Sequence, residues 1–111
     1  GLKVAGGSDC PIETGNPLFE FYAACTRQDH NGYPAGGWQP QEKVNSMEAL
    51  KMLTTWGAHA EFNEHRRGRI SIGFDADLTI LSEDITTCSP QTILNTEVIM
   101  TIVGGNIVYH N

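Results

Sequence analysis

The chain has few basic residues, and this shortage limits the partners it can bind. Lysine and arginine together number 7 against 13 aspartates and glutamates, so the formal net charge is −6 at pH 7 and the pI is near 5.0. A protein that follows a nucleic acid backbone needs enough clustered cations to neutralise several phosphates. We therefore expect no nucleic acid partner.

Long apolar runs and export signals are also missing. No apolar run approaches the roughly 20 residues that span a bilayer, and no basic segment followed by an apolar one resembles a signal peptide. The three cysteines, Cys10, Cys25 and Cys88, form no CxxC pair, which argues against a disulfide framework or a zinc knuckle. We expect reduced, buried thiols, no membrane partner and a cytoplasmic location.

The short motifs of several enzyme classes are absent as well. No G-x-S-x-G nucleophile elbow is present, and the glycine pairs match neither G-x-G-x-x-G nor the P-loop pattern. His59 and His65 stand six residues apart, and that spacing points two imidazoles about 120° apart on a helix. The basic run from His65 to Arg69 is expected to be a solvated helix end. No histidine-based metal site is expected within this chain.

Hydrophobic residues make up 40 % of the 111 positions, which is enough for one modest core. A strand is predicted at Leu2 to Ala5, followed by a loop that begins at Gly6. Asn16 is an N-cap residue before a helix predicted from Pro17 to Thr26. The glycine-rich and proline-rich stretch from Arg27 to Lys43 is predicted to be a long loop, either a lid or disordered.

The second half of the chain changes from helical to strand patterns. A capping box precedes a helix predicted from Ser46 to Thr55, which Gly57 interrupts before a short third helix that ends by Gly68. Beyond it, strands are predicted at Leu78 to Leu81, Glu97 to Val103 and Ile107 to Tyr109, the last two joined as a hairpin by a turn at Gly104-Gly105.

Asp9 is the one carboxylate whose position suggests chemistry. It follows the predicted first strand among small residues, where packing explains a carboxylate poorly and where it can reach a ligand. On local grounds an aspartate that caps the turn explains the same position.

The order of motifs along the chain closely resembles the C-terminal part of the amidohydrolase superfamily, specifically the amidohydrolase-3 branch. Two departures are Arg69, where a small residue is commoner, and Phe74-Asp75, where Lys-Leu is common. The similar segments cover nearly the whole chain: Leu2 to Glu13, Asn16-Pro17-Leu18, Thr26-Arg27, Trp38-Gln39-Pro40, Ser46 to Leu50, Thr54 to Ala58, Gly68 to Leu78 and Val103-Gly104-Gly105.

This resemblance implies an α+β fold made of two parts. Residues 1–67 would be the end of a (β/α)8 barrel, with its last strand and two to three helices. Residues 68–111 would supply short antiparallel strands to a small β-sandwich that also needs N-terminal segments. Active sites of such barrels lie at the C-terminal face of the strands.

The resemblance also implies a reaction, the hydrolysis of carbon-nitrogen bonds other than peptide bonds in a small amide-type substrate. Asp9 would bind a divalent metal, zinc, and handle the proton of the metal-activated water. Arg27 and Trp38, with Tyr33, would line the substrate pocket. The family's His-x-His motif is absent here, so we expect no bound metal and no activity from this chain alone.

Two further expectations concern association. A chain that holds only part of a barrel would leave strand edges and apolar helix faces uncovered, which predicts a homo-oligomer. The alternative function is a non-catalytic oligomerising or binding module derived from such an enzyme.

Overall fold

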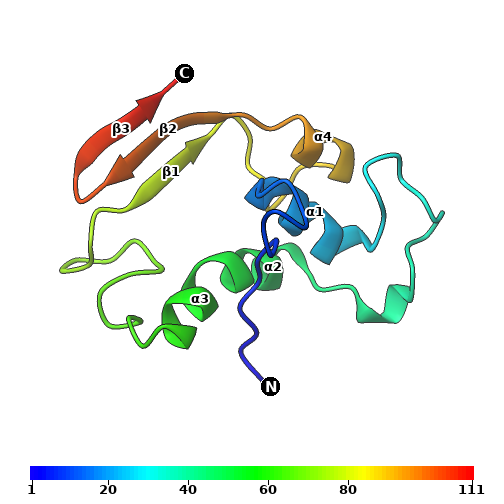
Figure 1. Ribbon diagram of the computed structural model, residues 1–111, viewed down its shortest axis with the longest axis horizontal. Helices are drawn as coiled ribbons and strands as arrows, with labels where there is room; N and C mark the ends of the chain where they lie inside the picture. Colours follow the sequence, from blue (N-terminus) through cyan, green and yellow to red (C-terminus); the bar gives the residue numbers. More distant parts are fainter.

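Helix α1 (Pro17–Thr26) begins and ends as the sequence predicts. The Asn16 side chain accepts the Leu18 N–H at 3.0 Å, and Pro17 fills the first turn, where no N–H is needed. Arg27 ends the helix in the left-handed conformation, with φ 58°, and donates its N–H to the Ala23 carbonyl. This description rests on a computed structural model of residues 1–111 (Figure 1).

Helix α2 (Ser46–Leu53) has the predicted capping box, but the break after it lies three residues earlier than expected. Gly57 does not separate the two helices, because it lies inside helix α3 (Thr55–Ala60). The break is at Thr54, whose hydroxyl donates to the Leu50 carbonyl at 2.6 Å and leaves the backbone at φ −131° and ψ −93°. A threonine side chain that bonds back in this way competes with the helical ladder.

Strands β1 (Leu78–Leu81), β2 (Val98–Val103) and β3 (Asn106–His110) form an antiparallel sheet in that order. The predicted hairpin is confirmed: Gly104 and Gly105, both with positive φ, form the two-residue turn between β2 and β3.

The loop before β1 holds that turn in place. The Asp77 carboxylate accepts the Gly104 N–H at 2.8 Å, and the Ala76 carbonyl accepts the Gly105 N–H at 3.0 Å. The Ala76-Asp77 and Gly104-Gly105 motifs are far apart in the sequence, but together they form and stabilise the β2–β3 turn.

Helix α4 (Pro90–Leu94) was not predicted from the sequence. It has five residues, too few to show a helical period, although Ser89 caps it by accepting the Thr92 N–H. Its buried residue Ile93 joins the core, which lies among α1, α2 and α4 (Figure 1). The core cluster contains Leu18, Phe21, Tyr22, Ala49, Ile85 and Ile93.

One prediction about the first half of the chain is wrong. The segment from Leu2 to Ala5 is not a strand, because none of the three strands pairs with it. The residue after this segment, Gly6, is bound to α2, because its N–H donates to the Met52 carbonyl at 3.0 Å. The segment from Arg27 to Lys43 is a long loop, as predicted, and it contains a short 3₁₀ helix, η1 (Pro40–Glu42), that was not predicted.

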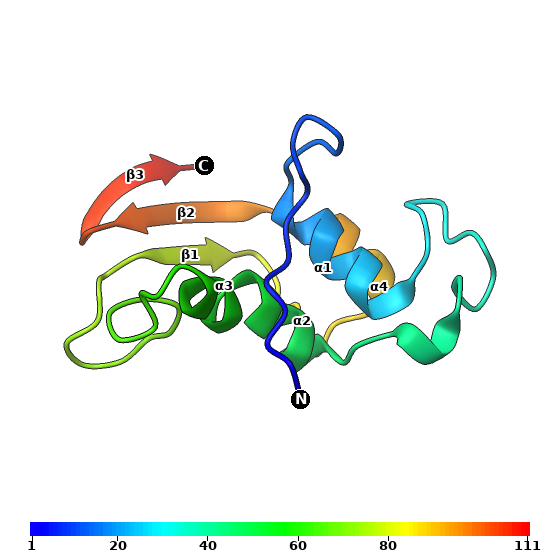
Figure 2. The same cartoon turned by 60° about the horizontal axis from the view of Figure 1, so that its bottom comes forward.

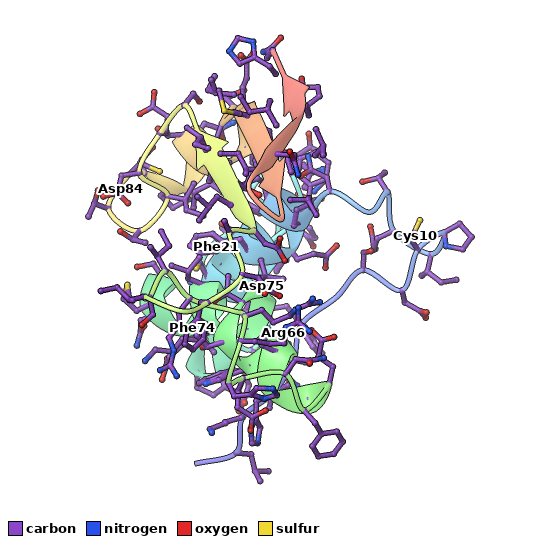
Figure 3. All side chains as sticks on the ribbon, turned by 90° about the vertical axis from the view of Figure 1, so that its left-hand side faces the viewer. Cys10, Phe21, Arg66, Phe74, Asp75 and Asp84 are labelled. Atoms are coloured by element: carbon purple, nitrogen blue, oxygen red, sulfur yellow. The ribbon has the colours of Figure 1, made fainter.

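The cysteines were expected to be buried, and one of them is not. All three are free, and Cys25 and Cys88 are half-buried, but Cys10 is exposed. Burial raises the pKa of the Cys25 thiol. Cys10 lies in a turn that projects from the body (Figure 3), which explains its exposure.

Candidate functional site

Asp9 lies in a tight turn at the tip of a projecting loop. Its carbonyl accepts the Ile12 N–H at 2.9 Å, and its backbone has φ 50°, in the left-handed region. Figure 2 shows the loop that follows the N-terminal segment standing clear of the helices. The side chain is exposed, and its carboxylate accepts no hydrogen bond. In this structure the carboxylate does not cap its own turn.

The residues of this chain do not make up a metal site. No three histidine, cysteine, aspartate or glutamate side chains gather where one ion could contact them all. A catalytic zinc takes three protein ligands and a water. Asp9 can supply one donor, and the others would have to come from residues outside this chain.

Arg27 and Trp38, predicted from the resemblance to line a substrate pocket, are brought together. The Trp38 N–H donates to the Arg27 carbonyl at 2.8 Å, and the Arg27 Nε donates to the Trp38 carbonyl at 3.1 Å. The guanidinium also lies over the indole ring, 4.9 Å from its centroid. An arginine over an aromatic face gains a cation–π attraction, so the two side chains act as one unit.

Glycine makes this contact possible. Gly37 has φ +92°, and a Cβ there would collide with the Thr26 carbonyl oxygen. The rest of the loop is also braced, because the Gln28 amide donates to the Gly32 and Pro34 carbonyls at 2.7 and 3.0 Å. Tyr33 is 73 % exposed.

Asp29 braces the same loop and carries a perturbed carboxyl. Its Oδ1 accepts the N–H groups of Asn31 and Tyr33 at 2.8 and 2.9 Å. The Tyr33 N–H is the main cause of the lowered pKa of Asp29. Through Oδ1, this carboxylate holds the loop in shape.

An open hollow of about 220 Å³ links Arg27 to the segment that leads to Asp9. Gly6 and Gly7 line it on one side, and Ala23, Arg27 and Met52 line it on the other. Neither Asp9 nor Trp38 is among its lining residues. The structure therefore places Arg27 beside the segment that bears Asp9, without joining the three predicted residues in one cavity.

The basic run after α3 is not simply solvated, as the sequence suggested. Arg66 donates to both oxygens of Asp75, at 3.0 and 3.1 Å, and Arg67 donates to the same carboxylate at 3.4 Å. Arg66 holds the pKa of the Asp75 carboxyl below its ordinary value.

The two departures from the family pattern lie in the same region. Arg69 lies over the Phe74 ring, 4.8 Å from its centroid, and Asp75 pairs with Arg66. Figure 3 shows Arg66, Phe74 and Asp75 close together beside α3. Arg69 and Phe74 therefore contact each other, whereas Asp75 pairs with an arginine of the basic run.

One group of residues escaped the sequence analysis. Lys3, Lys51, Arg67 and Arg69 line one pocket, although they are far apart along the chain. No motif connects them, and the only sequence signal was the basic run that contains Arg67 and Arg69.

Comparison with known proteins identifies the family to which this chain belongs. The Amidohydrolase family matches residues 1–109, and the chain belongs to that family. It is 35 % identical to YtcJ of Bacillus subtilis (strain 168), over 98 % of this chain and 21 % of that protein. It is 32 % identical to the N-substituted formamide deformylase of Arthrobacter pascens, over 98 % of this chain and 20 % of the enzyme.

Another curated protein and a solved structure are also similar to this chain. The LONG AFTER FAR-RED 3 protein of Arabidopsis thaliana is 33 % identical over 96 % of this chain and 18 % of its own length. The crystal structure of an amidohydrolase from Thermotoga maritima MSB8 matches 65 % of this chain and 17 % of that chain, with a TM-score of 0.54 and 25 % identity. The chain thus spans about a fifth of the curated relatives it matches.

The predicted α+β class and family are therefore confirmed, and the three-stranded antiparallel sheet is part of a fold similar to that of a known amidohydrolase. No helix of the structure has the length and apolar character that crossing a membrane requires.

Proposed function

We propose that the chain is the C-terminal part of a longer amidohydrolase that hydrolyses a carbon-nitrogen bond in a small amide-type substrate. The observation that carries this proposal is the family match over residues 1–109, together with 32 % identity to an N-substituted formamide deformylase. In this proposal residues 1–67 complete a barrel, and residues 68–111 complete a β-sandwich beside it.

Asp9 is the proposed catalytic carboxylate. Its exposed oxygens make no internal hydrogen bonds, so they are free to accept the proton of a water that attacks the substrate carbonyl carbon. The same carboxyl then returns the proton to the nitrogen as the carbon-nitrogen bond breaks. A divalent metal, which we expect to be zinc, would draw most of its ligands from outside this chain.

Arg27 and Trp38 are proposed to contact the substrate. Three interactions fix them to each other, and Arg27 borders the hollow next to Gly6 and Gly7. A paired guanidinium and indole offers one face that donates hydrogen bonds and one that is apolar. This suits a substrate with an amide oxygen and an organic substituent.

The chain alone is proposed to be inactive and to associate with itself. Only 9 of its 111 residues are buried, and Leu2, Ile72 and Phe62 are more than 80 % exposed. Such apolar surface favours association. The unpaired cysteines favour a reducing compartment, so we propose a cytoplasmic location.

The second candidate is a binding module without catalytic activity. The observation that favours it is the sheet, on which Val103, Ile107 and Val108 are each more than half exposed. A module of this kind would use the apolar sheet to bind another chain and would not need Asp9.

The test is to express the complete reading frame that contains this chain and to assay it against N-substituted formamides and simple amides. Asp9→Asn is expected to lower kcat by about 10²–10⁴-fold, as loss of an acid-base group does. Glu13→Gln, which removes the same charge four residues away, serves as the matched control and should keep activity.

Two results contradict the proposal. One is an Asp9→Asn protein as active as the wild type. The other is a reading frame that starts near Gly1, which would favour the binding module.

A further inference from the structure

A pocket of about 360 Å³ opens where the N-terminal segment, α2, α3 and the loop after α3 meet. Figures 1 and 2 both show the N-terminal segment passing beside α2. Four of the chain's seven lysines and arginines line this pocket, although the chain as a whole has a net charge of −6. They are Lys3, Lys51, Arg67 and Arg69, and Trp56 lies among them.

Most of these cations form no ion pair, although Arg69 lies over the Phe74 ring. Lys3, Lys51 and Arg69 take part in none of the ion pairs of the structure. The one acidic residue of the lining, Glu64, is engaged by His59, whose Nδ1 lies 2.9 Å from its Oε1. The lining therefore holds four cationic side chains against one carboxylate, and this excess of positive charge attracts anions.

Arg67 is also incompletely satisfied. Its Nη2 shares Asp75 at 3.4 Å with Arg66, its Nη1 lies 4.0 Å from Glu61, and its Nε is buried with no acceptor. A buried N–H without a partner costs free energy, and such groups call for a structural or functional reason.

The backbone fixes Arg67 and Arg69 at this place. Gly68, between them, has φ +92°, and a Cβ there would lie 2.8 Å from the Ala58 Cβ and 3.0 Å from the Thr55 Cα. Glycine thus lets the loop lie directly on α3. Both arginines therefore border the pocket through local geometry rather than through long flexible reach.

We propose that this pocket binds a phosphate group. A recess lined by charges of one sign concentrates counter-ions of the other sign, and arginine pairs with phosphate oxygens through charge-assisted hydrogen bonds. The volume is that of a small-molecule site, and the Trp56 ring can contact an organic body attached to the phosphate. This binding is independent of the proposed hydrolase activity.

The test is calorimetric titration of the complete protein with inorganic phosphate and, separately, with phenyl phosphate, in 150 mM sodium chloride. Saturable binding is expected with a Kd below about 1 mM. Lys51→Met should weaken it about tenfold, since it removes one of four clustered charges. Lys43→Met, which changes the net charge equally but lies outside the pocket, is the control and should bind as the wild type does.

The two probes distinguish the sources of the phosphate. Tighter binding of phenyl phosphate indicates a phosphorylated small molecule whose body contacts Trp56, whereas equal binding indicates the free ion. The proposal is overturned if neither probe saturates, or if Lys51→Met and Lys43→Met weaken binding to the same degree. Circular dichroism of both variants confirms that folding is unchanged.

Discussion

The helices and the sheet of this chain differ in how much of their apolar surface is buried within the chain. Helices α1, α2 and α4 bury one another's apolar residues around Phe21, which is fully buried. In the sheet, by contrast, every residue of β3 is exposed, and no sheet residue belongs to the buried core cluster. Neighbouring residues of a strand point to opposite faces, so β3 is uncovered on both. The helices, with Ile85 from the loop before α4, form a small core, whereas the sheet leaves most of its surface without a covering layer.

The largest expected effect comes from emptying the helical core. Phe21→Ala should lower the free energy of unfolding by about 3–5 kcal/mol, because it removes a large side chain from a packed site. Val108→Ala, on the exposed sheet, should change it by less than about 0.5 kcal/mol. Urea denaturation of both variants measures the difference. Equal losses would show that the sheet is packed as well as the helices.

A smaller effect is expected at the contact that joins Arg27 to Trp38. Gly37→Ala should cost about 2 kcal/mol more than Gly36→Ala, since an added Cβ there collides with neighbouring backbone. Both glycines have positive φ, but Gly36 has open space around it, so it controls for the strain of the backbone alone. Thermal unfolding compares them, and similar melting temperatures would argue against the close approach.

The capping box of α2 should contribute less. Asn45→Ala removes the side chain that accepts the Glu48 N–H at 2.9 Å and should cost about 1 kcal/mol. Glu42→Ala, three residues earlier and outside the box, is the comparison variant and should leave the melting temperature nearly unchanged. A null effect of Asn45→Ala would mean that packing alone sets where α2 begins.

The smallest effect concerns pH. Arg66 lowers the pKa of Asp75, so the pair stabilises the fold above the pKa of an unfolded aspartate, about 3.9. That contribution is lost as the pH falls through the lower pKa of the folded state. The difference in melting temperature between the wild type and Asp75→Asn should therefore be present at pH 7 and shrink below pH 4. A difference that does not depend on pH would contradict the ion pair.

Local signals predicted much of this fold correctly. Asn16-Pro17 placed the start of α1, Asn45 and Glu48 placed the start of α2, and Gly104-Gly105 placed the hairpin. In each case the structure depends on hydrogen bonds between residues within a few positions of one another, and such bonds leave a recognisable pattern in sequence.

The failures occurred where the deciding contact leaves no recognisable pattern in the sequence. Leu2 to Ala5 has strand composition but no strand beside it, and a strand exists only as part of a sheet. The break at Thr54 depends on a side-chain bond to Leu50 that propensity does not reveal. For the candidate site, the resemblance identified Asp9, Arg27 and Trp38, but only the structure showed that Arg27 and Trp38 lie together and that Lys3 joins Arg67 at one pocket.

The contrast between the helices and the sheet is tested most directly by hydrogen exchange on the chain in dilute solution. Our account predicts slow exchange of the α1 amides around Phe21 and fast exchange in β2 and β3. If the complete protein covers the sheet as proposed, both regions should exchange slowly there. Amides of β2 and β3 in the dilute chain that are as protected as those of α1 would contradict the account, since the sheet would then be stable without a covering layer.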